Sequence, residues 1–323
     1  MPDAPETHRT EPAFLSSDPR ASSADAAMFA GALSFCRRPY ARDLAGVDVV
    51  VVGVPVDTAV SNRPGCRFGP RALRQASAQL SWARSWPSPF DPFEQLSVAD
   101  WGDIAFDYAR PAEVPQAVEA ALRAIHTAGP ATLCLGGDHF TTYPALRAHS
   151  ARHGKGLSLI QFDAHTDTWG SDERETIDHG TMFRRAAEEG LIDPAQSIQI
   201  GIRTTNDDPM GFEIRDANWV HEQGIDATIA AIRSVVGDNP AYLTFDIDCL
   251  DPAFAPGTGT PVCGGLTTWQ AKECLSRLDG IRLVGMDLVE VAPAYDHAEV
   301  TALAGATLAL EMLCLYARIQ RPA

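Results

Sequence analysis

Short runs of apolar residues alternate with stretches of helical periodicity along most of the chain. The run Val49-Val50-Val51-Val52-Gly53-Val54 is continuously apolar, which is typical of a strand buried on both faces of a sheet. Similar runs predict further strands at 96–99, 132–135, 157–162, 197–200, 242–245 and 283–286. Between them, the pattern predicts helices at 69–83, 112–128, 143–153, 182–189, 226–236, 268–278 and 301–316.

This alternation of strands and helices predicts the α/β fold class. Strands separated by helices of about 10–15 residues form βαβ units, which build a mainly parallel sheet covered on both faces. No internal repeat or linker divides the pattern, so we expect a single catalytic domain over residues 41–323. Residues 1–40 are rich in Pro, Ser, Asp and Ala and predict an arm that is poorly ordered or docks on the body or on a neighbouring subunit.

The charge balance of the chain narrows the class of partner. The 323 residues carry a formal net charge of −16, which argues against a nucleic acid partner because such recognition needs a basic patch. A negative field is compatible with a cationic small molecule.

Cysteine usage and hydropathy predict the compartment. The seven cysteines are scattered without C-x-x-C spacing, which favours reduced thiols over a disulfide framework. No run reaches the ~18 apolar residues of a membrane span, and the N-terminal stretch lacks the pattern of a signal peptide. We therefore expect a soluble, cytoplasmic protein with no membrane partner.

Three predicted strands are each followed by a motif of acidic and histidine residues. The motifs are Gly136-Gly137-Asp138-His139, Asp163-Ala164-His165-Thr166-Asp167 and Asp246-Ile247-Asp248. Ligands of α/β sheets bind beyond the carboxyl ends of the strands, so the three motifs can meet in one crevice. In extended chain, alternate side chains share a side, which predicts that Asp163, His165 and Asp167 point one way and that Asp246 and Asp248 do likewise.

The six side chains of these motifs predict a metal centre with two cations. Four adjacent carboxylates would repel one another and resist desolvation without positive charge between them. Six ligands are too many for a single zinc ion but suit two cations that share bridging carboxylates. An oxygen-rich set with imidazole and no thiolate favours Mn²⁺ or another hard divalent ion. The candidate ligands are His139, Asp163, His165, Asp167, Asp246 and Asp248.

At these motifs the sequence resembles the ureohydrolase (arginase/agmatinase) family, over residues 35–316. Two further stretches, Asp178-His179-Gly180-Thr181-Met182-Phe183 and Glu290-Val291-Ala292-Pro293-Ala294-Tyr295-Asp296, are typical of the bacterial agmatinase branch. The resemblance implies a three-layer α/β/α, arginase-like fold, two Mn²⁺ per chain and a homo-oligomer, a trimer or hexamer. It also implies that Asp163 and Asp246 bridge the cations, with His139 and Asp167 on one and His165 and Asp248 on the other.

The resemblance further implies an amidinohydrolase mechanism, in which a metal-bridging hydroxide attacks the guanidinium carbon. Glu290 would hold the guanidinium through charge-assisted hydrogen bonds. His179 can move protons at neutral pH and would donate one to the departing amine. Thr260 and Asp167 are expected to help orient the hydroxide or the substrate.

The expected substrate is agmatine, cleaved to putrescine and urea. The loop after the second motif lacks the Asn-Thr-Pro and Ser-Gly-Asn elements with which arginases recognise arginine, and Asp172, Glu173 and Glu175 make it acidic. Arg63 and Arg67 could instead serve a carboxylate, so guanidinobutyrate or another guanidino compound is the alternative substrate. A single-zinc deacylase and a catalytically inactive family member are the remaining alternatives, and the complete ligand set argues against both.

Overall fold

The structure is a computed structural model, and it describes residues 29, 31–82, 84–171 and 176–320. Within these residues, eight strands form one sheet in the order β2-β1-β3-β8-β7-β4-β5-β6. Every pairing in the sheet is parallel, as the alternation of strands and helices predicts. The strands are β1 Val49–Val54, β2 Val98–Asp103, β3 Ala131–Gly136, β4 Ser158–Phe162, β5 Ile198–Ile200, β6 Glu213–Arg215, β7 Pro240–Asp246 and β8 Arg282–Val289.

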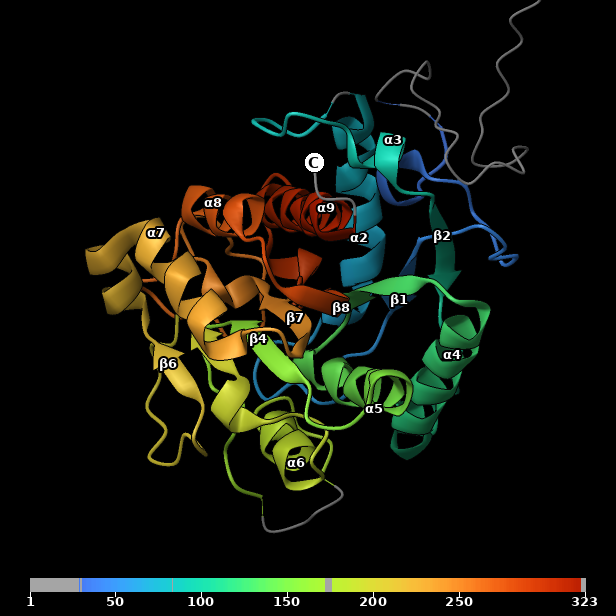
Figure 1. The fold of residues 1–323 in the computed structure, drawn as a ribbon. Helices are drawn as coiled ribbons and strands as arrows, with labels where there is room; N and C mark the ends of the chain where they lie inside the picture. The colour runs from blue at the N-terminus through green and yellow to red at the C-terminus, as the bar shows by residue number, and fades with distance from the viewer. Residues whose placement is uncertain (1–28, 30, 83, 172–175, 321–323) are drawn as a thin grey trace, which may run out of the picture.

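Helices cover both faces of the sheet and complete a three-layer α/β/α sandwich (Figure 1). Helices α4, α5 and α6 lie on one face, and α2, α7, α8 and α9 lie on the other. The expected fold class is therefore confirmed. The helices are α2 Gly69–Ser77, α3 Pro92–Gln95, α4 Val114–Ala128, α5 Thr142–His153, α6 Met182–Glu188, α7 Ala217–Val236, α8 Thr268–Arg277 and α9 Val300–Gln320.

Each face of the sheet has its own hydrophobic core, which explains why the strands are continuously apolar. Along β1, Val49 and Val51 join the core beneath α2, α7, α8 and α9. Val50, Val52 and Val54 join the core on the opposite face, beneath α4, α5 and α6. Successive residues of a strand point to opposite faces, so both sets must be apolar in a sheet covered on both sides.

Helix α9 is the most apolar helix of the described chain. Its most apolar 18 residues have a mean hydropathy of 1.7, and by length and composition alone it is the one described helix that could cross a membrane. However, 78% of its most apolar stretch is buried inside the protein. A helix that is hydrophobic all round is expected at such a position, between the sheet and the neighbouring helices.

Several elements differ from the sequence prediction in their bounds or were not predicted. Helix α7 begins at Ala217 rather than at 226, because the side chain of Asp216 caps it by accepting a hydrogen bond from the Trp219 backbone N–H. Gly224, with a φ of 79°, interrupts this helix and hides its first half from the periodicity. Strand β2 lies at 98–103 rather than 96–99, and the edge strand β6 was not predicted because its three residues are all half-buried.

Two histidines on helices of the same face of the sheet are buried. His126 on α4 and His149 on α5 are 8% and 0% exposed, and their rings lie 4.3 Å apart. His149 bonds the Ala145 carbonyl through Nδ1 and the Thr132 hydroxyl through Nε2. Helices α4 and α5 pack against each other there, which shields both imidazoles from solvent.

The described end of the N-terminal arm packs against the body. Phe35 and Cys36 are fully buried, and the Phe35 backbone N–H donates to Asp100 Oδ2 at 2.8 Å. Residues 1–28 lie outside the described part of the chain. The division into an arm of residues 1–40 and a domain of residues 41–323 stays a prediction.

Candidate metal centre and active site

The predicted ligands come from strands that are neighbours in the sheet. His139 follows β3, Asp163 and His165 follow β4, and Asp246 ends β7. Glu290 follows β8, which lies between β3 and β7. Because all these strands are parallel, their carboxyl ends meet at one edge, and the three motifs come together as the sequence predicts.

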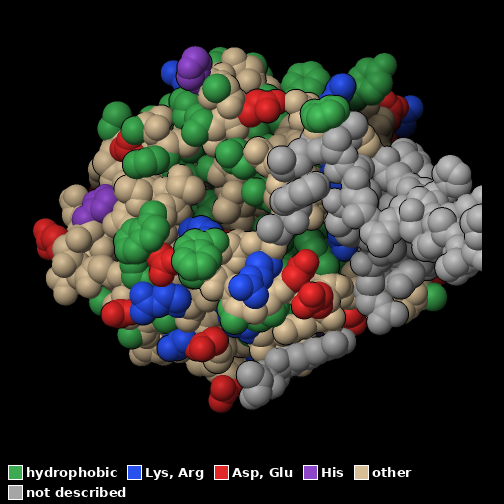
Figure 2. All heavy atoms as spheres, turned by 90° about the horizontal axis from the view of Figure 1, so that it is seen from above, with side chains coloured by type: hydrophobic (Ala, Val, Ile, Leu, Met, Phe, Trp, Pro, Cys, Tyr) green, Lys and Arg blue, Asp and Glu red, His purple; other side chains and the backbone are tan. Residues whose placement is uncertain are grey.

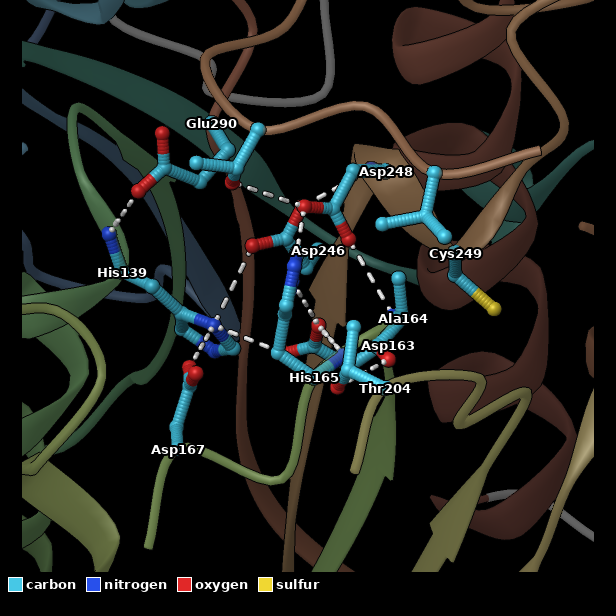
Figure 3. Close-up of polar contacts among 12 residues, drawn as sticks. His139, Asp163, Ala164, His165, Asp167, Thr204, Asp246, Asp248, Cys249 and Glu290 are labelled. Carbon is cyan, nitrogen blue, oxygen red and sulfur yellow. Dashed lines mark hydrogen bonds and ion pairs between the residues drawn. The ribbon is translucent and has the colours of Figure 1, made fainter. Parts of the chain in front are cut away.

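Two clusters of ligand atoms share one residue, Asp163. His139, Asp163 and Asp167 form the first cluster, and Asp163, His165 and Asp248 form the second. In each cluster the ligand atoms lie within 4.8 Å of one another. Figure 3 shows these side chains pointing toward one another from separate segments of the chain. The sharing of Asp163 supports its predicted role as a bridge between two cations.

The first cluster is centred on the Nδ1 atom of His139. This atom lies 3.0 Å from Asp163 Oδ2 and 2.9 Å from Asp167 Oδ2. Asp246 Oδ2 is 3.3 Å from the same nitrogen, which places the fourth predicted ligand here as well. The bridging role of Asp246 stays a prediction, because its carboxylate is not part of the second cluster.

In the second cluster, His165 Nδ1 lies 3.1 Å from Asp248 Oδ2 and 3.4 Å from Asp163 Oδ1. The Thr260 hydroxyl donates to Asp248 Oδ2 at 3.2 Å and lines the cavity described below. Thr260 therefore contacts a candidate ligand, and its expected part in orienting the hydroxide or the substrate stays a prediction.

The ligand side chains converge, but the alternation of side chains along a strand, from which the sequence predicts their convergence, is not the cause. Asp167 has a φ of 52°, so the segment after Asp163 is not an extended strand. Asp248 lies in a 3-10 turn, and its backbone N–H donates to Asp246 Oδ1. Tight turns beyond the strand ends, rather than a strand period of two, aim these carboxylates inward.

The pKa shifts show how strongly the carboxylates compete for positive charge. Burial, followed by the charge of Asp163, raises the pKa of Asp167 to about 7. Burial and the charges of Asp248 and Asp163 also raise the pKa of Asp246 well above its ordinary value. Burial opposes the ionisation of Asp163, but hydrogen bonds from His139 and His165 outweigh it and hold its pKa below the usual range.

The donor set fits two divalent cations. His139 Nδ1 is buried without a hydrogen bond of normal geometry among the described residues, while three carboxylate oxygens surround it. An imidazole nitrogen held among carboxylates is a suitable ligand, and cations would replace the protons that these groups otherwise share. Cys249 does not join the set, because its sulfur points away toward the Ile200 carbonyl (Figure 3).

A hydrogen-bonded chain behind His139 fixes the orientation of its ring. His139 Nε2 lies 2.8 Å from the Thr244 hydroxyl, which donates to Asp287 Oδ1 at 2.5 Å. Asp287 is buried and also accepts bonds from the Thr142 and Tyr242 hydroxyls. Such partners orient a metal-binding imidazole and set which nitrogen faces the metal. Thr244 and Asp287 give no signal in the sequence, since each lies inside an ordinary strand.

Glu290 and His179 form a second buried unit beside the ligands. Glu290 Oε1 accepts a bond from the His139 backbone N–H at 2.8 Å and lies 2.9 Å from His179 Nδ1. Glu290 Oε2 is buried without a hydrogen bond of normal geometry among the described residues. The φ of Glu290 is 64°, a conformation that costs free energy in a non-glycine residue and is often kept at functional sites.

The other nitrogen of His179 faces Ser61, in the loop after β1. His179 Nε2 lies 2.8 Å from the Ser61 hydroxyl and 3.1 Å from the Ser61 backbone N–H. Burial alone would lower the pKa of His179, but the hydrogen bond and charge of Glu290 and the charges of Asp167 and Asp138 raise it to about 9. Ser61 gives no signal in the sequence, because nothing local links it to a histidine far along the chain.

A cavity of about 320 Å³ opens onto the candidate ligands. Arg63 and Arg67 are not among the described residues that line it. Arg67 instead pairs with Asp57 at 2.5 Å, and the guanidinium of Arg63 lies 5.4 Å from the centre of the Tyr295 ring. The acidic positions Asp172, Glu173 and Glu175 lie outside the described residues. The cavity is lined by Ser61, His165, Asp167, Trp169, Gly170, Asp178, His179, Gly180, Thr181, Asp246 and Thr260.

The fold and the site together define a three-layer α/β protein with a candidate centre for two metal ions. The chain belongs to the arginase family, because the model of that family matches residues 47–314. This is a family of binuclear metal enzymes that act as hydrolases. The chain is therefore a hydrolase.

Proteins similar to this chain carry the name agmatinase. An agmatinase of Chromobacterium violaceum is 54% identical over 287 residues, which cover 89% of each protein. An agmatinase of Proteus mirabilis is 50% identical over 299 residues, covering 91% of this chain and 96% of that protein. A crystal structure described as a hypothetical agmatinase from Burkholderia thailandensis has a TM-score of 0.89 and 54% identity, covering 90% of this chain and 93% of that one.

Proposed function

We propose that the chain is an agmatinase that hydrolyses agmatine to putrescine and urea. The observation that carries the proposal is the buried oxygen Glu290 Oε2, beside two ligand clusters that share Asp163. The nearby Cys66 thiol is only a weak donor to the Glu290 carboxylate, and a charged guanidinium N–H would be the stronger partner for this buried oxygen. The agmatinases that are 50–54% identical over nine-tenths of the chain support this substrate.

The mechanism assigns a task to each part of the site. A guanidinium is a stable cation, so its cleavage needs a strong nucleophile, a fixed orientation and a proton for the amine that leaves. When bound, two divalent cations supply the nucleophile by lowering the pKa of water toward neutrality. Glu290 holds the guanidinium through Oε2, while its Oε1 keeps His179 in place. His179, protonated at neutral pH, donates a proton to the departing amine nitrogen.

The residues proposed to hold the cations favour Mn²⁺. Asp163 would serve both cations, His139, Asp167 and Asp246 would hold one, and His165, Asp248 and Asp246 would hold the other. Carboxylate oxygens with one imidazole for each cation suit Mn²⁺, and the nearby thiol of Cys249 points away.

We expect two equivalents of metal per chain after loading with Mn²⁺. The reason is that each of two clusters offers three ligand atoms within 4.8 Å of one another. Metal analysis of the dialysed, loaded protein measures this value directly. Saturation at a single equivalent would contradict the binuclear site and would revive the single-metal deacylase.

The described residues of the cavity favour agmatine over guanidinobutyrate. The two substrates share the guanidinium and differ at the far end, which is an ammonium in agmatine and a carboxylate in guanidinobutyrate. A carboxylate would need a cation, and neither Arg63 nor Arg67 lines the cavity among the described residues. Of the two, Arg67 is also already paired with Asp57.

We therefore expect kcat/KM to be higher for agmatine than for guanidinobutyrate by about tenfold or more. Urea release from the Mn²⁺-loaded protein, measured with each substrate alone and in competition, tests this. A higher value for guanidinobutyrate would reverse the assignment. Absence of urea from both substrates would favour another guanidino compound or an inactive family member.

The quaternary structure and location are proposed from the same relationship. We infer a cytoplasmic homo-oligomer, a trimer or hexamer. Large hydrophobic side chains are exposed on the single chain, including Phe68, Trp86 and Trp269 at 58%, 82% and 65%. Figure 2 shows hydrophobic side chains among charged ones on one face of the molecule. Light scattering of the purified protein measures the assembly.

A further inference from the structure

The residues that line the substrate cavity differ in burial from its inner end to its mouth. Asp167, His179 and Asp246 are 5%, 8% and 3% exposed and mark the inner end, beside the candidate metal ligands. Trp169 and Asp178 are half-buried, so they lie where the cavity meets solvent. A linear substrate that places its guanidinium at the inner end therefore extends its other end toward this mouth.

Trp169 and Asp178 are held together across the mouth by Gly180. The Trp169 backbone N–H donates to the Gly180 carbonyl at 3.0 Å, and the Gly180 backbone N–H donates to Asp178 Oδ1 at 2.7 Å. A Cβ at Gly180 would lie 3.2 Å from Trp169 Cε3 and 3.3 Å from Asp178 Oδ1. The indole and the carboxylate thus approach the same glycine, and a side chain at this position would crowd both of them.

The chemistry of this pair suits an alkylammonium group. Asp178 Oδ1 is bonded within its own loop, whereas Oδ2 has no hydrogen-bond partner among the described residues. An ammonium is attracted by a carboxylate and by the face of an indole, and half-burial strengthens both attractions relative to water. Trp169 also lies close to the metal ligands, since its ring centre is 6.2 Å from that of His165. The subsite is therefore continuous with the reacting end of the cavity.

We propose that Trp169 and Asp178 form the subsite that binds the distal ammonium group of the substrate and selects it over a neutral or anionic end. This inference rests on the proposed hydrolysis of agmatine. Neither residue touches the reacting guanidinium, so both act on specificity and not on the chemical step.

The first test compares agmatine with n-butylguanidine, which has the same four-carbon chain and no ammonium. In Asp178→Asn, the amide oxygen can still accept the Gly180 N–H, so the turn is kept while the charge is lost. We expect kcat/KM for agmatine to fall about tenfold or more, mostly through KM, and the value for n-butylguanidine to stay within about twofold. If n-butylguanidine turns over too slowly, its inhibition constant against agmatine replaces that value.

Two substitutions of Trp169 test the role of the indole, and Asp207→Asn serves as the control for loss of a carboxylate. Trp169→Phe keeps an aromatic face and should retain most of the preference for agmatine, whereas Trp169→Leu should lose it. Asp207→Asn removes an exposed carboxylate that does not line the cavity and should change neither substrate. Equal losses for both substrates in Asp178→Asn, or no loss for either, would overturn the subsite. Failure of the proposed function is distinct, since the wild-type protein would then release no urea from agmatine.

Discussion

Replacing Asp163 by asparagine is expected to abolish urea release and to weaken the binding of both cations. Asp163 is fully buried, and it is the residue that the two ligand clusters share. An amide offers one neutral oxygen where the carboxylate offers two charged ones, so one cation loses a ligand, the other keeps only a neutral one, and the site loses a full negative charge. Loss of partners that merely orient a ligand costs 10–100-fold in metal affinity or activity, so the loss here should exceed about a hundredfold.

Metal analysis and urea release from the same preparation measure this prediction. Asp238→Asn provides the matched control, because it makes the same chemical change at an exposed position and should leave both quantities unchanged. Circular dichroism confirms that the variant is folded. Turnover near the wild-type rate with two bound equivalents would show that the ligands are misplaced.

The site residues that could be predicted from sequence are those that belong to short motifs at the ends of strands. Val49–Val54 and the other apolar runs predict a parallel sheet, and a parallel sheet gathers the segments that follow its strands at one edge. The order of the strands need not be known for this inference. It is enough that the motifs of Asp163 and Asp246 each follow a strand, and β4 and β7 are indeed neighbours.

The site residues that give no signal in the sequence act through contacts between segments that are far apart in the chain. Ser61 meets His179 across 118 positions, and Thr244 meets His139 across 105. A serine in a loop and a threonine in a strand are common, so only the folded chain distinguishes them. The positive φ values of Asp167 and Glu290 could not be predicted either, because they depend on contacts with residues that are distant in the sequence.

The burial of so many acidic groups explains why the site needs cations to work as proposed. Asp163, Asp246 and Asp248 are all at most 3% exposed, and Asp167 is 5% exposed. Burial and mutual repulsion raise the pKa of Asp246 and Asp167, so these carboxylates hold protons in the absence of other positive charge. Divalent cations compete with those protons, and we infer that metal binding weakens as the pH falls below about 7.

Replacing His179 by asparagine is expected to lower kcat by about 10²–10⁴-fold, the usual contribution of a positioned acid or base. His179 is a suitable acid because it has a partner in either protonation state. The imidazolium donates through Nδ1 to Glu290 and through Nε2 to the Ser61 hydroxyl, whereas the neutral ring accepts the Ser61 backbone N–H at Nε2. Loss of a proton to the departing amine therefore leaves no orphaned nitrogen.

Metal content and the pH profile separate this role from that of a ligand. His179→Asn should keep two equivalents of metal, and the exposed-site control His297→Asn should keep full activity as well. The imidazolium is the donor, so wild-type kcat should fall as the pH rises through the pKa of His179. That pKa is about 9 from the protein charges alone, and two bound cations repel the imidazolium and move the fall to lower pH. The variant has no imidazole to deprotonate, so this alkaline fall should be missing from its profile. Loss of a metal equivalent in His179→Asn would make His179 a ligand, and an unchanged alkaline fall would assign the proton to another group.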